Sequence, residues 1–322
     1  MGKKNQEKHW KNMIKRTLYF GNPAYLSLKD EQIVVRLPEV EKNDALPDAF
    51  KEKAAATIPI EDIGVVVLDH KQITITQMLI EKLVENNCAV VTCDSSRMPS
   101  GLLMPLESNI IQHERFTTQI EASLPLKKQL WQQTIMKKIG NQAVLLKQRT
   151  NCETANMEKW AASVRSGDSE NLEARAAAYY WANLFPELPD FTRKRDGLPP
   201  NNLLNYGYAL LRAIIARALV AGGLLPTLGI HHRNRYNAYC LADDIMEPYR
   251  PFVDQKVIQI MDKFHDYSEL SRDIKAELLQ IPVIEVNIDG KRSPLMVAAA
   301  TTVNSLNKCY SGASKKLLYP DL

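Results

Sequence analysis

The sequence predicts an α+β protein, with a small N-terminal β-rich domain followed by a larger all-α domain. Three observations support this prediction. A chain of 322 residues is long for a single core. Short runs of β-branched and aromatic residues fill positions 13–94, whereas apolar residues recur at helical spacing from 113 to 310. The stretch between them, 95–112, has two prolines, a glycine and no periodicity, which is typical of a linker.

The β-rich domain begins with three short runs, RTLYF, AYLSL and QIVVRL, that alternate or cluster strand-forming residues. The polar residues 29–31 between the second and third runs predict a hairpin. ATIPIEDIGVVVLD indicates two more strands around Gly64, and CAVVTCD a further one. Between these, the period changes to that of a helix capped by Thr74 or Thr76. Its apolar face is expected to contain Ile75, Met78, Leu79 and Leu83.

The second domain is predicted to consist of long helices. We expect Asp168 or Ser169 to cap the helix SENLEARAAAYYWANLF, and the helix NYGYALLRAIIARALVAGG to run from Asn205 to the pair Gly222–Gly223. A hairpin around Asp289–Gly290 interrupts the helices. Residues 311–322 form a tail, and residues 1–12 a basic extension that is expected to be disordered. The remaining predicted helices are PLKKQLWQQTIMKKIGNQAVLLKQ, LADDIMEPYRPFVDQKVIQIMDKF, YSELSRDIKAELLQ and SPLMVAAATTVNSLNKCY.

Composition excludes several classes of protein. The five cysteines include no CxxC pair, which argues against structural zinc and favours a reducing, cytoplasmic setting. The most apolar stretch carries Arg212 and Arg217 near its middle, so no membrane span is expected. Lys and Arg exceed Asp and Glu by 41 to 37, a mild excess that permits a nucleic-acid partner without requiring one.

The stretch LGIHHRNRYNAYCLADDIMEPYRP could carry chemistry. It places His231 and His232 in a loop, followed by Asp243, Asp244 and Glu247 at a helix start. Spacings of three and four residues put these carboxylates on one helix face. An imidazole with carboxylates suits Mn²⁺ or Mg²⁺. The alternative is ordinary, because acidic residues at a helix start stabilise its dipole and histidine pairs often lie on the surface.

Glu173 is a further candidate, because its helix neighbours are small apolar and aromatic residues. One turn on lie Ala176 and Ala177, and Tyr180 follows at seven positions. Such a face is expected to pack against another helix. A carboxylate there needs a cation or metal as its partner.

Three separated segments, TLYFGNPAYLSL, SENLEARAAAYYW and GIHHRNRYNAYCLADDIMEPYRPFVD, together resemble the CRISPR-associated integrase family, the first of the numbered Cas proteins. The likeness extends from about Met13 to the terminal YPDL and is greatest to the branch that accompanies type II effectors. The family has an N-terminal β domain, through which it dimerises, and a C-terminal helical domain that is catalytic. Both agree with the fold predicted from periodicity.

The resemblance implies a catalytic metal site. The glutamate of the family's N-x-E segment falls on Glu173, the histidine of its G-x-x-H motif on His232, and the second acid of its D-x-x-E-P segment on Glu247. Asp244 is implied as a supporting ligand or a hydrogen-bond acceptor. Because His231 precedes His232, the assignment between the two histidines stays open, and Pro248 is expected to bend the helix.

The implied activity is insertion of new spacers into a CRISPR array, in which each 3′-hydroxyl of the incoming DNA attacks a phosphodiester with Mg²⁺ or Mn²⁺ as cofactor. The implied partners are prespacer and repeat duplex DNA, a second copy of the chain, a small Cas subunit that bridges two dimers, and the type II effector nuclease. Candidate phosphate contacts are basic residues in three stretches, whose alternative interpretation is a solvated surface: Lys127, Lys128, Lys137, Lys138, Lys147 and Arg149; Arg193, Lys194 and Arg195; Arg233 and Arg235.

Two other functions remain open at this point. The first is a metal-dependent nuclease of branched DNA without an integration role. The second is a non-catalytic basic scaffold that binds DNA, in which the acidic residues are only helix-start charges.

Overall fold

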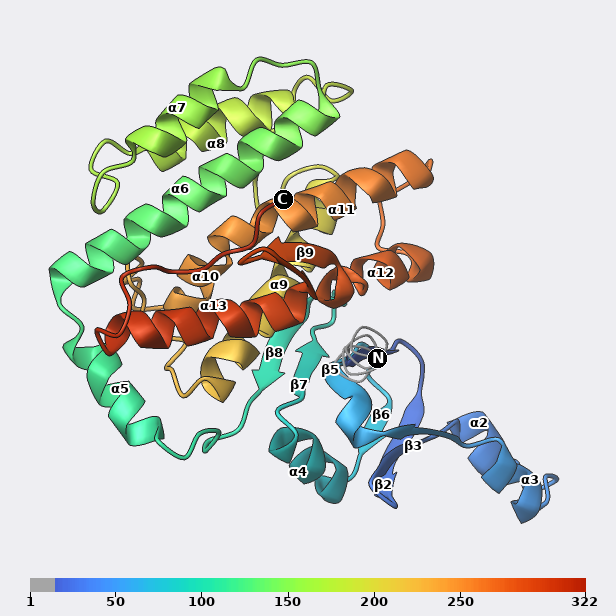
Figure 1. Cartoon of the computed structure of the whole chain (residues 1–322). Coiled ribbons are helices and arrows are strands. Elements are labelled where there is room, and N and C mark those ends of the chain that lie inside the picture. Colours follow the sequence, from blue (N-terminus) through green and yellow to red (C-terminus); the bar gives the residue numbers. More distant parts are fainter. Residues whose placement is uncertain (1–14) are drawn as a thin grey trace, which may run out of the picture. The chain divides into compact units, whose positions relative to one another are not determined.

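The computed structural model describes residues 15–322 and divides the chain into two compact units, the first ending at Ser108 and the second spanning Asn109–Leu322 (Figure 1). The predicted basic extension, 1–12, lies outside the described residues. The first unit contains two sheets and the second is mostly helical. The predicted α+β class is therefore confirmed.

One sheet of the first unit has the strand order β1-β5-β7-β8. Its strands are β1 (Arg16–Phe20), β5 (Ile63–Leu68), β7 (Ala89–Cys93) and β8 (Pro99–Leu103). The first three are parallel, and β8 is antiparallel to β7. Strand β8 lies inside the stretch predicted as a linker, so that prediction is wrong for 99–103. Its proline is tolerated because it is the first residue of a strand at the sheet edge.

The other sheet has the order β4-β3-β2-β6. Its strands are β2 (Ala24–Lys29), β3 (Gln32–Arg36), β4 (Ala56–Pro59) and β6 (Ile73–Ile75). The predicted hairpin joins β2 to β3, with positive φ at Asp30 and Glu31 as a two-residue turn requires. Helices α2 (Pro38–Glu41) and α3 (Asp48–Lys53) and the 3₁₀ turn η1 (Ile60–Asp62) lie between β3 and β5.

Helix α4 (Gln77–Glu85) buries Leu79 and Leu83 in the core of this unit, as expected. Met78 is 64% exposed, so its predicted place on the apolar face is wrong. The reason is geometric, because Met78 precedes Leu79 by one residue and is therefore rotated by about 100° away from the buried stripe.

Helix α9 (Asn201–Ala221) forms the centre of the second unit and packs against α10, α11 and α13. It is long and apolar enough to cross a membrane, but 72% of its most apolar window is buried inside the protein, as in a core helix. The other elements are α5 (Gln112–Glu121), α6 (Leu124–Arg149), α7 (Ala155–Ser163), α8 (Leu172–Asn183), α10 (Cys240–Met246), η2 (Glu247–Tyr249), α11 (Arg250–Lys263), α12 (Arg272–Leu278), η3 (Ile281–Val283), β9 (Glu285–Ile288), β10 (Lys291–Pro294) and α13 (Leu295–Tyr310).

The ends of these helices agree only partly with the sequence signals. The N-cap position of α8 is Asn171, but the carboxylate of Asp168, three residues earlier, accepts the N–H groups of Leu172 and Glu173 at 2.9 and 3.0 Å and so supplies the predicted capping interaction. Helix α9 begins at Asn201, one turn before the predicted Asn205. The buried side chain of Asn201 donates to two carbonyls of the preceding loop, which allows this earlier start. The predicted hairpin joins β9 to β10.

The tail 311–322 packs against α6, beside which it runs in Figure 1. The hydroxyl of Tyr319 lies 2.8 Å from Oγ1 of Thr134, and both groups are buried. The amide of Asn141 donates to the carbonyls of both Pro320 and Pro248. The tail is thereby connected through one α6 side chain to the backbone beside Glu247.

Candidate active site

Helix α6 presents a buried stripe in which one lysine stands among apolar and amide side chains. Trp131, Ile135, Lys138, Gln142 and Leu145 follow each other at spacings of three or four residues, and all are buried. Helices α7 and α8 and the turn η2 pack against α6. Lys138 therefore points into the packed interior, and its ammonium needs an anionic partner there.

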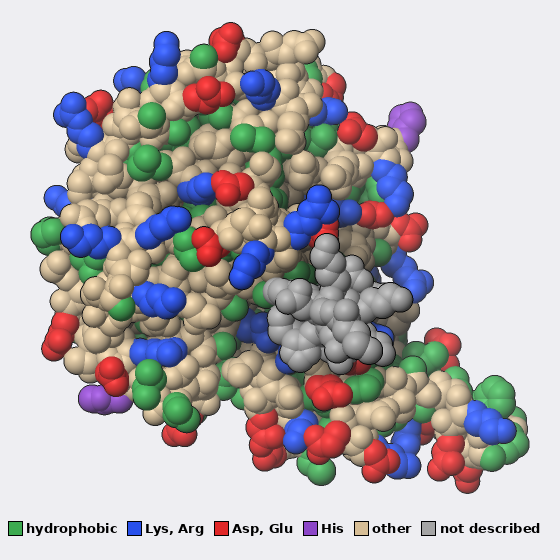
Figure 2. Space-filling model, viewed as in Figure 1, with side chains coloured by type: hydrophobic (Ala, Val, Ile, Leu, Met, Phe, Trp, Pro, Cys, Tyr) green, Lys and Arg blue, Asp and Glu red, His purple; other side chains and the backbone are tan. Residues whose placement is uncertain are grey.

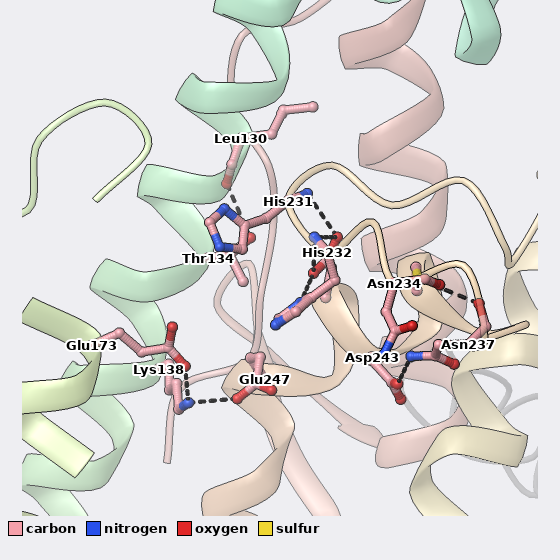
Figure 3. Close-up of polar contacts among 12 residues, drawn as sticks. Leu130, Thr134, Lys138, Glu173, His231, His232, Asn234, Asn237, Asp243 and Glu247 are labelled. Carbon is pink, nitrogen blue, oxygen red and sulfur yellow. Dashed lines mark hydrogen bonds and ion pairs between the residues drawn. The ribbon is translucent and has the colours of Figure 1, made fainter. Parts of the chain in front are cut away.

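Two carboxylates from distant segments meet at this ammonium. Nζ of Lys138 lies 2.6 Å from Oε1 of Glu173, in the first turn of α8, and 2.6 Å from Oε2 of Glu247, in η2 (Figure 3). The exposed fractions of the three side chains are 9% for Lys138, 26% for Glu173 and 5% for Glu247. Glu173 and Glu247, both predicted as site residues, are thus brought to one point.

The predicted helix from Leu241 to Phe264 is divided into α10, η2 and α11. Pro248 falls in the short 3₁₀ turn at the break, as expected for a residue that cannot donate to the helix ladder. The break places Glu247 at the junction of the two helices, where its side chain faces α6. Burial would raise the pKa of Glu247, but Arg250 and Lys138 outweigh this effect and lower it, so the group is ionised.

A loop from Gly229 to Tyr239 carries the two predicted histidines. Nδ1 of His232 lies 2.5 Å from Oδ1 of Asp244, and the main-chain N–H groups of His231 and His232 also point to this carboxylate. Asp244 is fully buried and holds the loop against α10. Its role here is that of a hydrogen-bond acceptor, the second of the two roles expected for it.

His232 lies on the side of the site where Glu173 and Glu247 meet, and in Figure 3 its ring points toward them. Its hydrogen bond to Asp244 raises the pKa of His232, and the charges of Glu247 and Glu173 act in the same direction. His231 is instead stacked on Trp131, with ring centroids 4.1 Å apart, and burial lowers its pKa. The geometry therefore favours His232 over His231 as the site histidine.

Gly229 is required by the close approach of the loop to α10. A Cβ atom there would lie 2.4 Å from the carbonyl oxygen of His232 and 2.8 Å from Oδ2 of Asp244. Neither atom has room to move, because one is backbone and the other accepts from the main-chain N–H groups of His231 and His232. This contact gives a physical reason for glycine at the first position of G-x-x-H.

Sequence reasoning missed a second layer of charged residues behind Glu247. Arg250 donates to Oε1 of Glu247 at 2.9 Å and lies over the ring of Tyr208. The Tyr208 and Tyr180 hydroxyls both donate to the buried Asp254. Burial raises the pKa of Asp254 to about 6, although both tyrosines oppose this effect. The one available signal was the spacing Glu247–Arg250–Asp254, which puts all three on one helical face.

The side chains at this site can be compared with the ligands that a metal ion requires. Within residues 15–322, no group of three or more His, Cys, Asp or Glu side chains stands ready to hold an ion. The ammonium of Lys138 lies between the two carboxylates instead. Oε2 of Glu247 is buried, and its short contact is the ion pair with Nζ of Lys138 at 2.6 Å. Two carboxylates that meet at one cation, with an imidazole beside them, fit a hard divalent cation.

The predicted DNA-contacting residues lie in different surroundings. Lys138 is buried in the site, which excludes for this residue the solvated surface given as the alternative interpretation. Lys137 pairs with Asp321 of the tail, Arg149 with Glu187 and Asp262, and Arg193 binds two asparagines of α9. The predicted DNA-contacting residues that are exposed to solvent are Lys128, Lys147, Lys194, Arg195, Arg233 and Arg235. In Figure 2, Lys and Arg side chains are scattered over the visible face of the helical unit without forming a single patch.

Lys127, Arg233 and Arg235 line one cavity of about 500 Å³ that also reaches His232. Its wall is formed by residues of α5, the start of α6 and the histidine loop. Arg235 lies over the ring of Tyr236, which is 80% exposed. The cavity therefore places basic side chains beside His232, whereas Glu173 and Glu247 do not line it.

The fold and the site together define a two-domain protein with an acidic, histidine-containing centre on helices, suited to a divalent cation. The model of the family described as "CRISPR associated protein Cas1" matches residues 18–266, and the chain belongs to this family. The family predicted from the sequence is thereby confirmed, and membership supports a nuclease or integrase role in a CRISPR system.

Named relatives agree. The "CRISPR-associated endonuclease Cas1" of Neisseria meningitidis serogroup C is 34% identical over 95% of each chain. Two solved structures share the fold. A "casposase bound to integration product" has a TM-score of 0.71 at 20% identity and covers 94% of this chain and 92% of its own. A "Cas6-RT-Cas1–Cas2 complex" has a TM-score of 0.69 at 20% identity, covering 95% of this chain and 36% of that one.

Proposed function

We propose that the protein is a divalent-metal-dependent DNA integrase that inserts new spacers into a CRISPR array by transesterification with DNA 3′-hydroxyls. One observation carries the proposal. Glu173 and Glu247, 74 positions apart in the chain (247 − 173), meet at one buried cation beside His232. Helix-start charges that merely stabilise a dipole would point to solvent. Carboxylates that converge on one cation position, here filled by Lys138, are the kind of ligand through which proteins hold Mg²⁺ for phosphoryl transfer.

Glu173, His232 and Glu247 would hold Mg²⁺ or Mn²⁺. When bound, the ion would lower the pKa of the attacking hydroxyl and neutralise charge on the phosphate oxygens. The chain's own residues prepare the ligands. Arg250 keeps Glu247 ionised and fixes one of its oxygens. Asp244 orients His232 through Nδ1, which leaves Nε2 for the site.

The cavity beside His232 is proposed to receive the DNA backbone. Lys127, Arg233 and Arg235 would contact phosphates, and these contacts would position a strand without reading its sequence. Exposed Tyr236 offers a face on which an unpaired base can stack. Holding attacker and target in line would supply much of the rate enhancement.

The partners are proposed from family membership. The N-terminal β domain would form the homodimer, and a small Cas subunit would bridge two dimers. The 34% identity to the Neisseria relative supports the choice of a type II-like branch, in which the effector nuclease takes part. A reaction on array DNA would take place in the cytoplasm, which is the location we propose.

The experiment uses the purified protein with its small Cas partner, a short duplex donor and a supercoiled array plasmid. We expect donor covalently joined to the plasmid in Mn²⁺ or Mg²⁺, and no joining in EDTA. His232→Ala should abolish joining, and His231→Ala, which removes the stack on Trp131 and an edge-to-face contact with His232, should retain most of it.

Two outcomes would support the alternatives. Plasmid nicking or branched-DNA cleavage without joined donor would indicate a nuclease without an integration role. Joining that is unchanged in His232→Ala would leave the protein as a DNA-binding scaffold for another enzyme.

A further inference from the structure

We propose that Lys138 is a tethered cation of the metal site, which holds Glu173 and Glu247 together in the metal-free protein and leaves its position when a divalent ion binds. The inference rests on the proposed metal-dependent function and deepens it. It assigns a role to a side chain that the sequence presents as one more member of a basic run.

The first argument is the position of the ammonium. It lies 2.6 Å from one oxygen of each glutamate, and these oxygens come from α8 and η2, two elements that both pack against α6. Mg²⁺ needs oxygen ligands at about 2.0–2.1 Å. A metal that uses both oxygens must therefore lie where the ammonium lies, and two cations cannot share that space.

The second argument is electrostatic. Without Lys138, two carboxylates would face each other in a largely buried site, with Arg250 engaged by only one of them. Like charges at short range in a medium of low dielectric constant repel strongly. The lysine therefore supplies, in the metal-free protein, the positive charge that the site requires to fold around both glutamates.

The third argument concerns which cation can move. Arg250 is held by Oε1 of Glu247 and by the ring of Tyr208 beneath it. Lys138 has no aromatic partner among the described residues, and its hydrogen bond goes to Oε1 of Glu173, on the exposed side of the site. Glu173 is 26% exposed, so solvent reaches the site on that side. A lysine on a flexible four-carbon stem can withdraw in that direction, whereas Arg250 cannot.

The test measures Mn²⁺ binding to the full-length protein from the electron paramagnetic resonance signal of free Mn²⁺. Lys138→Met keeps the length and apolar stem but removes the competing charge, so its Mn²⁺ affinity should rise about tenfold or more over wild type. Lys137→Met is the matched control, because Lys137 is the next residue on α6 and pairs with Asp321 instead. Its Mn²⁺ affinity should equal that of wild type.

If Lys138 merely supported the fold, its substitution would lower the Mn²⁺ affinity instead of raising it. If Lys138→Met binds Mn²⁺ as wild type does, or more weakly, Lys138 does not compete with the metal and the inference is wrong. Glu173→Ala separates this failure from that of the proposed function. If wild type binds Mn²⁺ and Glu173→Ala does not, the proposed metal site stands even when the Lys138 inference is wrong. If wild type does not bind Mn²⁺, or Glu173→Ala binds it equally well, both the proposed metal site and the Lys138 inference are wrong.

Thermal unfolding provides a readout that needs neither DNA nor activity. In EDTA, Lys138→Met should melt below wild type, and Mn²⁺ should raise its Tm by more than it raises that of wild type. If Lys138→Met folds only with Mn²⁺ present, that dependence itself agrees with the inference. Lys138→Arg, which keeps the charge, should not bind Mn²⁺ more tightly than wild type, and tighter binding by this variant would contradict the inference.

Discussion

Asp244 and His232 form the contact that orients the histidine loop. The buried carboxylate lies 2.5 Å from Nδ1 of His232, and the main-chain N–H of His232 points to the same group. Because an imidazole that gives one nitrogen to a carboxylate has its ring orientation determined, the other nitrogen can serve as a ligand. Asp244 thus differs in role from Glu247, which lies at the site itself.

Asp244→Asn should weaken the site without unfolding it. The amide retains the shape of the carboxylate but is a poorer acceptor for Nδ1 and can present a donor to it. We expect a 10- to 100-fold loss of Mn²⁺ affinity, on the order seen when groups behind metal-bound histidines are changed. Asp243→Asn is the control, since Asp243 binds Arg212 and Asn237 instead. Equal losses in both variants would contradict this role of Asp244.

Gly229→Ala should distort the histidine loop, because its Cβ would overlap the carbonyl of His232. We expect a loss of roughly 1–3 kcal/mol in the free energy of unfolding, as for other overpacked sites, together with reduced DNA joining. Gly140→Ala on α6 is the contrast, since nothing lies within 4 Å of its Cβ position. That variant should gain about 0.5–1 kcal/mol in urea denaturation. A stable, active Gly229→Ala would refute the steric argument.

The buried Asp254 should make stability depend on pH. Its pKa is raised from 3.8 to about 6 in the folded protein, so the folded state binds more protons than the unfolded state between these values. The stabilising contribution is complete below about pH 4 and is lost as pH rises through about 6. Relative to Asp254→Asn, wild type should lose about 2 kcal/mol between about pH 4.5 and pH 7.5. Denaturant unfolding of both proteins at several pH values measures this, and a constant difference would show that Asp254 titrates normally.

The C-terminal tail should contribute to stability. Tyr319 is buried against α6 and shares a hydrogen bond with Thr134. Tyr319→Ala should lower the free energy of unfolding by about 3–5 kcal/mol, as for other buried aromatic side chains. Lys315→Ala, at an exposed position in the same tail, should change it by no more than about 0.5 kcal/mol. Similar melting temperatures for Tyr319→Ala and wild type would mean that the tail is dispensable.

Arg235→Ala should weaken DNA binding and leave metal binding intact. A lost phosphate contact lowers affinity for all sequences alike and reduces the slope of log K against log salt concentration by about one. Fluorescence anisotropy with a labelled duplex at several salt concentrations measures both. Lys291→Ala, an exposed position on the β9–β10 hairpin, serves as the control. An unchanged salt slope in Arg235→Ala would remove Arg235 from the DNA contacts.

Local features were predictable where their cause is local. The β2–β3 and β9–β10 turns follow from polar residues and glycine between strand-forming runs, and Asp168 supplies the capping interaction of α8 because a short acidic side chain accepts from free N–H groups. The break at Pro248 has an equally local cause. Strand β8 was missed because an edge strand is defined by pairing with β7, and its proline and glycine resemble a linker.

By itself, the sequence determined the α+β class, the family, and three residues whose chemistry suits a cation. Only the tertiary structure decided that Lys138 lies between Glu173 and Glu247, that Asp244 orients His232, and that His231 stacks on Trp131. The physical reason is that periodicity reports which helix face is buried but not which charges from other elements meet there. A lysine in a basic run and a lysine held between two carboxylates have the same local sequence, and only their partners distinguish them.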